Sequence, residues 1–391
     1  MFNTKKLLVL TLITLGAFGT SCDDGTENEI KPSGCPVTLD VQSFYSDNQS
    51  AEVGVLFQGV DCKGQPTSVN ASDLTASEEY NGTSKPLSLA ETKANLYPIE
   101  KKYKNLVVLS LDTIASITNN ATAFSALKSA AKSFASKVLD GNTYLLFSIF
   151  DGRQDVFLLG FVAKKGSNIF VNYADAAAAI DAMKCGDAID GLGNKLCADP
   201  STNLYGSTLA GANLLNQLAS YVVSNVPELG GNPLFSKSLV VFTDGTDEAN
   251  YVSKDQMIST LSSSTYNGTK YFSIGLSGDV NQTILKDIGR DGFFWASDYS
   301  QLTVKFDELA ATLKKFSSSY KRFAYCTAKR SGMITFKLEH KSGTSISEAF
   351  IANAKSEFSC PLGSITNSGG RMGSDSSQLE LSLPTYNPGR N

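Results

Sequence analysis

The stretch from Leu106 to Leu111 is almost unbroken apolar sequence, and it limits the possible folds more than any other part of the chain. A run of this kind, with β-branched Val107 and Val108, is typical of a central strand that is covered on both faces. Asp112 follows the run directly, and an amphipathic segment that ends at Gly141 comes next. The pattern therefore predicts a buried strand, a loop that carries an acid, and a helix.

The same alternation continues along the chain and predicts a parallel, doubly wound α/β sheet. Further strands are expected at Thr143–Phe150, Val156–Val162, Ser238–Phe242, Tyr271–Leu276 and Gly292–Ala296. Helices are expected at Tyr173–Met183, Leu209–Val223, Asn281–Gly289 and Tyr299–Phe316. In such sheets, ligands bind in loops at the carboxyl ends of the strands, which is where Asp112 falls.

Composition excludes several classes of function. The chain has 391 residues, which allows two or three domains, and a net charge of −4 without the basic patch that nucleic-acid binding requires. His340 is the one histidine, and the sequence has no G-x-S-x-G turn. A Ser-His-Asp hydrolase and a multi-histidine zinc site are therefore excluded. The residues around His340 alternate like a half-exposed strand, so we expect it on the surface.

The amino-terminal segment has the features of an export signal. Residues 1–21 contain two lysines followed by an apolar core, and they precede Cys22. The segment resembles a bacterial lipoprotein signal, which implies lipidation of Cys22, an anchor in the membrane, and a place in the cell envelope, at the outer membrane or cell surface. An ordinary signal peptide cut near this point is the alternative. Residues 22–34 form an acidic tether that we expect to be flexible.

Six cysteines besides Cys22 agree with an exported protein, because an even number in an oxidising compartment indicates disulfides. The sequence does not determine their pairing, and it lacks the C-x₂-C pair of a metal cluster. Joining each cysteine to its near neighbour gives Cys35–Cys62, Cys185–Cys197 and Cys326–Cys360.

Residues 35–104 and 320–391 have alternating β patterns with turn signals, so a β-module is expected on each side of the α/β region. From residue 363 the tail is rich in Ser, Gly and Asn and is expected to be loose.

Three loops of the α/β region form a set: Asp112-x-Ile114-x-Ser116, the loop at Thr202, and Thr243-Asp244-Gly245. Their order, spacing and strand context resemble the von Willebrand factor A domain, a Rossmann-like fold with a metal-ion-dependent adhesion site. The resemblance covers residues 105–316. Some members of the family carry this domain inserted in a β-sandwich, which implies that 35–104 and 320–391 pack together as a flanking all-β module.

Carried over from the family, the metal ligands would be Asp112, Ser116, Thr202 and Asp244, and the cation would be Mg²⁺. Ile114 stands where the family has a serine ligand. Isoleucine offers no oxygen to a hard cation, so we expect a degenerate site with lower affinity, or a scaffold that no longer binds metal. The segment from Cys185 to Cys197 leads towards Thr202 and would lie on the rim of the metal face, where it would shape partner specificity or serve only as a surface loop.

The resemblance implies adhesion-type binding of an extracellular or envelope protein, whose acidic residue completes the metal coordination. A metal-independent structural subunit of an envelope assembly is the alternative, and Ile114 favours it. An enzyme using Ser116 or Asp244 is a third possibility. No nucleophile–base pair accompanies these residues, so we expect the protein not to be an enzyme.

Overall fold

The computed structural model describes residues 36–46, 51–62, 64–97, 103–159, 169–185, 197, 199–225, 234–276, 280–329, 331–352 and 360. The signal segment, Cys22, the acidic tether, Cys35 and the tail from 361 lie outside these residues, so the predictions about them stay predictions. In the helices that the structure describes, none is both long and apolar enough to cross a membrane.

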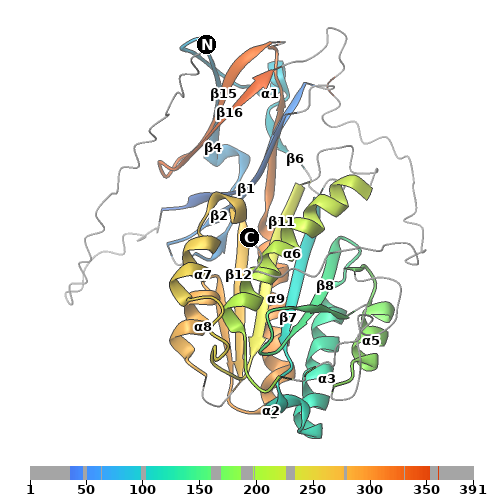
Figure 1. The fold of residues 1–391 in the computed structure, drawn as a ribbon. Coiled ribbons are helices and arrows are strands. Elements are labelled where there is room, and N and C mark those ends of the chain that lie inside the picture. Colours follow the sequence, from blue (N-terminus) through green and yellow to red (C-terminus); the bar gives the residue numbers. More distant parts are fainter. Residues whose placement is uncertain are drawn as a thin grey trace, which may run out of the picture. The chain divides into compact units, whose positions relative to one another are not determined.

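A mixed sheet forms the centre of the α/β region (Figure 1). Five strands run parallel in the order β8-β7-β11-β12-β13, and the short strands β9 and β10 pair antiparallel with β8. Their bounds are β7 Tyr103–Asp112, β8 Thr143–Phe150, β9 Phe157–Leu158, β10 Ile169–Phe170, β11 Leu234–Thr243, β12 Thr269–Leu276 and β13 Gly292–Ala296. All ten residues of β7 are buried, which confirms the central strand predicted from its apolar run.

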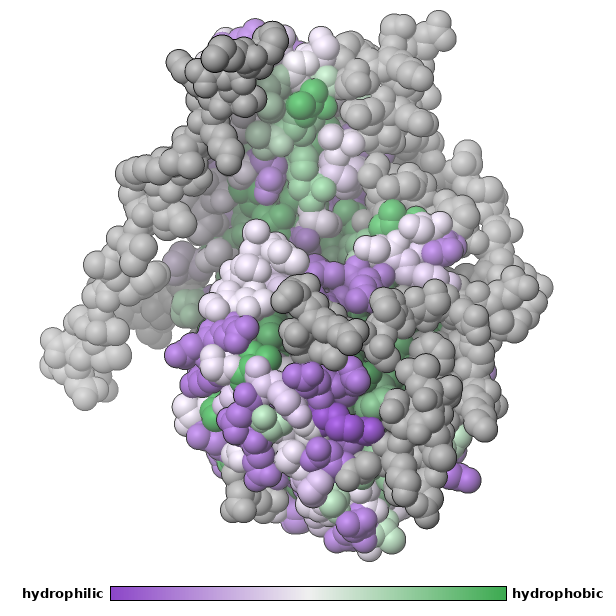
Figure 2. All heavy atoms as spheres, viewed as in Figure 1, coloured by the Kyte–Doolittle hydropathy of each residue, from purple (hydrophilic) through white to green (hydrophobic). Residues whose placement is uncertain are grey.

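Helices cover both faces of this sheet, which confirms the doubly wound α/β class. One face packs against α3 (Ala121–Val138), α5 (Tyr173–Ala182) and α9 (Leu302–Ser319). The other face packs against α6 (Leu204–Asn225), α7 (Lys254–Leu261) and α8 (Gln282–Ile288). The solvent-facing surface over α6, α7 and α8 is mainly hydrophilic or neutral (Figure 2), as amphipathic helices on a buried sheet require.

Segments from both ends of the chain build a β-sandwich, as expected. One sheet has the order β1-β2-β14-β6, with β3 beside β2, and the other has the order β16-β15-β4-β5. Strands β14, β15 and β16 follow the α/β region, and β14 and β15 pair with strands that precede it. The bounds are β1 Thr38–Ser46, β2 Glu52–Val60, β3 Pro66–Thr67, β4 Leu74–Tyr80, β5 Thr83–Pro86, β6 Asn95–Tyr97, β14 Lys321–Cys326, β15 Gly332–His340 and β16 Ser345–Ala352, with the short helix α1 at Leu89–Thr92.

The first strand and the last helix of the α/β region both have an end at the amino-terminal edge of the parallel sheet. Strand β7 begins there at Tyr103, and α9 ends one residue before β14 begins. Tyr103 and Tyr320 pack together, with ring centroids 5.9 Å apart, and share a buried cluster with Tyr45, Leu56 and Leu234. The carboxyl edge, where Asp112 lies, is therefore the end of β7 away from this cluster.

Disulfides join Cys185 to Cys197 and Cys326 to Cys360, which confirms two of the three expected pairs. Cys62 is also disulfide-bonded, and Cys35 lies outside the described residues.

One expectation from the sequence was wrong. His340 is buried, with 5% of its surface exposed, because β15 ends in a turn in which Ser342 contacts the imidazole Nδ1. The predicted strand Val156–Val162 contains the short β9, and its residues 160–162 lie outside the described ranges. Helix α7 had no counterpart among the predicted elements, and α6 begins at Leu204, earlier than the apolar periodicity indicated.

Candidate metal centre

Asp112 and Thr243 end two adjacent parallel strands, β7 and β11, at the carboxyl edge of the sheet. The strand that follows β7 in the chain, β8, pairs with one side of β7, and β11 pairs with its other side. The strand order therefore reverses at β7, and ligands of open α/β sheets bind at such a topological switch point. The Thr243 hydroxyl donates to Asp112 Oδ2 at 2.6 Å, and the backbone N–H of Ile114 donates to Oδ1 at 3.2 Å. Asp112 is completely buried, so these two bonds fix its carboxylate.

Ser116 lies on α2 (Ala115–Thr118), a single helical turn that follows Asp112. Its hydroxyl donates to Asp244 Oδ2 at 2.5 Å, although the two residues are 128 positions apart. Ser116 is exposed and Asp244 is half-buried, so this contact opens to solvent. The structure therefore brings together two of the predicted site residues on the accessible side of Asp112.

Thr202 is held against the same loops by its backbone. Its carbonyl accepts from the N–H groups of Glu248 and Ala249 at 2.9 and 3.1 Å. A Cβ added to Gly245 would lie 2.7 Å from the Thr202 hydroxyl, so glycine is required for this close approach. All four predicted ligands, Asp112, Ser116, Thr202 and Asp244, thus come from loops that meet at one edge of the sheet.

The loop after β8 adds a third carboxylate, Asp151, that sequence reasoning missed. Asp151 is 1% exposed and forms an ion pair with Arg153, with Nη2 and Oδ2 2.7 Å apart. Its carbonyl accepts from the N–H of Asn203, and Asn203 Nδ2 donates to the carbonyl of Arg153, which joins this loop to the Thr202 loop. Asp151 follows a buried strand just as Asp112 does, so the same sequence rule would have found it.

Asp247 was also missed, and it fixes the start of α6. Its Oδ1 accepts from the N–H of Tyr205 at 2.9 Å, so a residue of the β11 loop caps the helix that carries the Thr202 loop. The spacing of Thr243, Asp244 and Asp247 was visible in the sequence, but their partners in α6 were not.

The charges at the site fit a bound cation. Burial, and then the negative charges of Asp244 and Asp151, raise the pKa of Asp112 well above its ordinary range. Burial also raises the pKa of Asp244, whose Oδ1 is buried and has no hydrogen-bond partner. In the described ranges no three His, Cys, Asp or Glu residues are placed to hold a metal ion together, and Asp151 is paired with Arg153, so the predicted donors are the carboxylates of Asp112 and Asp244 and the hydroxyls of Ser116 and Thr202. Hard cations such as Mg²⁺ prefer this oxygen set and retain some of their waters.

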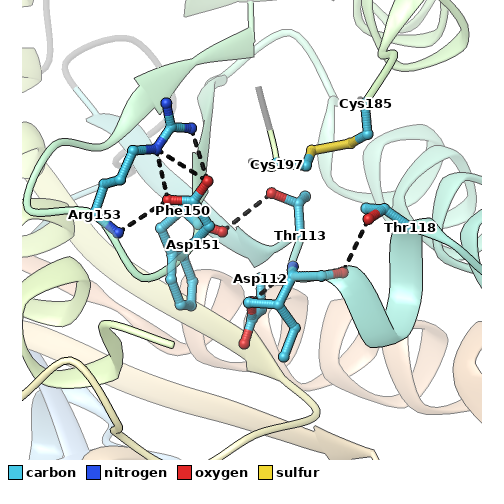
Figure 3. Close-up of a disulfide and its surroundings, with 9 residues drawn as sticks. Asp112, Thr113, Thr118, Phe150, Asp151, Arg153, Cys185 and Cys197 are labelled. Carbon is cyan, nitrogen blue, oxygen red and sulfur yellow. Dashed lines mark hydrogen bonds and ion pairs between the residues drawn. A yellow bond between two sulfur atoms is a disulfide. The ribbon is translucent and has the colours of Figure 1, made fainter. Parts of the chain in front are cut away.

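Ile114 differs from these oxygen donors, because its side chain has no oxygen to offer a cation. It is 8% exposed, and its Cδ1 would lie 3.5 Å from a Cβ at Gly245, so its side chain lies beside the loop that carries Asp244. The hydroxyl of the preceding residue, Thr113, donates to the carbonyl of Phe150 at 3.0 Å and is already used (Figure 3). The loop after β7 therefore offers one carboxylate and one hydroxyl to a cation.

The Cys185–Cys197 disulfide lies beside Thr113 and Thr118 in the loop region of the site (Figure 3). Cys197 packs against the core on the α3 side of the sheet. The segment between the two cysteines lies outside the described residues, so the expectation that it lies on the rim of the metal face stays a prediction.

No protein-family model and no curated protein sequence matches the chain. Among solved structures, the chain is similar to proximal thread matrix protein 1 from the mussel byssus, with 14% identity and a TM-score of 0.39 over 58% of this chain and 48% of that one. It is also similar to the vWF domain of the type V pili tip protein Mfa5 from Porphyromonas gingivalis, with 12% identity and a TM-score of 0.37 over 54% of this chain and 95% of that one. A third similar structure is the pilus adhesin SpaC from Lactobacillus rhamnosus GG, with 10% identity and a TM-score of 0.38 over 75% of this chain and 36% of that one.

The chain spans about half the length of the mussel protein. Similarities at this level carry no conclusion about function, which rests on the geometry of the site.

Proposed function

We propose that residues 105–316 form a von Willebrand factor A-type domain that binds a protein ligand through a divalent cation at the carboxyl edge of the sheet. One observation carries this proposal: side chains from three separate loops converge there, and the buried Asp244 Oδ1 is left without a partner. A buried carboxylate oxygen is costly unless something compensates its charge, and a cation would do so.

Asp112 and Asp244 would supply negative charge to the cation, and Ser116 and Thr202 would supply hydroxyl oxygens. When bound, Mg²⁺ supplies a positive charge that attracts a carboxylate of the partner. Hydrogen bonds from Thr243 and Ile114 orient the Asp112 carboxylate before a ligand arrives. Ser116 is exposed, which leaves the approach to the site open to a partner's acidic side chain.

We further propose that this binding is of the adhesion type and not catalytic, and that lipidation at Cys22 anchors the protein in the cell envelope, at the outer membrane or the cell surface. The two observed disulfides support an oxidising compartment.

Ile114 supports a second candidate function, a structural subunit of an envelope assembly that binds its neighbours without metal. Its buried side chain lies beside the Gly245 backbone where the family would place a ligand oxygen. A metal-independent interface tolerates this substitution, whereas a metal site loses a ligand.

Calorimetric titration of the purified protein with Mg²⁺ and Mn²⁺ separates the two candidates. The adhesion-type proposal predicts saturable binding that Asp112→Asn abolishes while the melting temperature of the metal-free protein stays near that of the parent. An absence of binding at about millimolar metal, which corresponds to about −4 kcal/mol, would reject the cation and favour the structural subunit.

A further inference from the structure

In the β-sandwich, strand β4 has a carboxylate, Glu78, on the face that otherwise carries core residues. In β4, Glu78 lies directly opposite Phe336 of β15, and directly opposite residues of an antiparallel pair share one face of the sheet. Phe336 is 1% exposed and belongs to the sandwich core. Ala76 and Tyr80, two residues before and after Glu78, also pack against that core. Glu78 therefore points inward, where strands normally carry apolar residues.

This carboxylate lacks a cationic partner among the described residues. Glu78 is 7% exposed, and its Oε1 is buried with no hydrogen-bond partner. Lys85 lies opposite it on β5, yet no ion pair joins these two side chains in the described structure. Tyr325 of the other sheet is completely buried close by, and its pKa is raised first by burial, then by the charge of Glu78 and by a hydrogen bond with it. The fold therefore provides Glu78 with a phenol as its polar neighbour, but with no cation.

Glu78 opens onto a cavity of about 330 Å³ at the β5 edge of the sandwich. The cavity is lined by Glu78, Tyr80, Asn81, Thr83, Lys85 and Lys329. Its volume falls at the lower end of the range for small-molecule pockets. The lining combines one carboxylate, an amide, a hydroxyl, an aromatic ring and two ammonium groups, and Lys329 lies 4.3 Å from the centroid of the Tyr80 ring.

We propose that this cavity binds a small, hydroxyl-rich anion of the acidic monosaccharide type. Hydroxyl groups of the ligand would bond to the polar lining side chains of Glu78, Asn81 and Thr83, and its carboxylate would lie between Lys85 and Lys329. One negative and two positive side chains leave the cavity with a net charge of +1, which favours a monoanion over a neutral sugar or a zwitterionic amino acid. This site is separate from the metal centre, so binding needs no divalent cation.

Calorimetric titration with D-glucuronate, D-glucose and L-glutamate in the presence of EDTA tests the proposal. We expect saturable binding of glucuronate, at least about tenfold weaker binding of glucose and glutamate, and at least about tenfold loss of glucuronate affinity in Glu78→Gln and Lys85→Gln. Lys85 lies on an exposed edge strand, so its substitution cannot act by unfolding the core.

Glu79→Gln is the matched control, because Glu79 is the next residue on β4 and pairs with Lys337 instead of lining the cavity. This variant should bind glucuronate like the parent. Absence of saturable glucuronate binding at about 10 mM, equal affinity for glucose or glutamate, or an equal loss in Glu79→Gln would each overturn the proposal.

Discussion

Two regions of the molecule bury carboxylates and compensate their charge in opposite ways. In the β-sandwich, Glu52 is 2% exposed, and both the Arg322 guanidinium and the Tyr45 hydroxyl donate to its Oε1. At the carboxyl edge of the α/β sheet, Asp244 Oδ1 is buried without a partner, and Asp112 adds a second negative charge.

The difference separates a structural carboxylate from one that is arranged for a ligand. Glu52 and Arg322 neutralise each other within the fold, on the neighbouring strands β2 and β14. Among the described residues around the metal centre, the positive neighbour is Arg153, which is already paired with Asp151. A cation from solution would complete the charge balance there, whereas at Glu52 the chain itself provides the cation.

Breaking the sandwich pair should have the largest effect on stability. Arg322→Leu leaves Glu52 buried without its cation and should lower the free energy of unfolding by about 3–5 kcal/mol, measured by chemical denaturation. The double variant Glu52→Leu/Arg322→Leu removes both charges and should recover most of that loss. A loss below about 1 kcal/mol in the single variant would show that the pair is not a structural requirement.

The opposite result is expected at the metal centre. Asp244→Ala removes an uncompensated carboxylate, so the metal-free protein should keep or gain stability while its Mg²⁺ affinity falls by at least about 100-fold, or about 2.7 kcal/mol. Calorimetry and thermal denaturation measure the two quantities. Asp181→Ala, which changes an exposed acid of α5, is the control and should leave metal binding unchanged. A strongly destabilised Asp244→Ala protein would place this carboxylate with Glu52 among the structural ones.

Substitutions at position 114 should test whether the metal centre lacks one oxygen ligand. Ile114→Ser should raise Mg²⁺ affinity by about tenfold, because it adds a hydroxyl beside the Asp244 loop. Ile114→Ala creates similar space without an oxygen and should not raise the affinity. Equal affinities in the two variants would mean that the residue at 114 does not face the cation.

The pH dependence of stability should also distinguish the two regions. The pKa values of Asp112 and Asp244 are raised above their ordinary value of 3.8, so between that value and the raised ones the folded state binds more protons than the unfolded state. The stability of the metal-free protein should therefore fall as pH rises through that window. Each of the two carboxylates should contribute a slope of at most about 1.4 kcal/mol per pH unit.

Denaturation at several pH values checks this prediction. Asp244→Asn should flatten the slope, whereas Asp181→Asn should not. Saturating Mg²⁺ should reverse the slope, because the cation binds the deprotonated carboxylates. Equal slopes for parent and Asp244→Asn would contradict the assigned direction.

The sequence by itself determined the elements whose signals are local. The apolar run before Asp112 predicted a central buried strand, and helical periodicity located α3, α5, α6 and α9, because strand and helix repeats depend on near neighbours. Two disulfides joined cysteines that are near neighbours in sequence. The position of Asp112 directly after a buried strand marked it as a site candidate, and the same rule would have found Asp151, whereas the set of four ligands came from the resemblance of three loops to the von Willebrand factor A domain.

The tertiary structure decided what depends on contacts between distant segments. Three sets of hydrogen bonds join separate loops: the bond from Ser116 to Asp244, the bond that caps α6 at Asp247, and the bonds that the Thr202 carbonyl accepts from the β11 loop. The burial of His340 and the inward direction of Glu78 depend on which face of a strand meets the second sheet. A strand's alternation shows that it has two faces, but only the pairing of distant strands determines which one is buried.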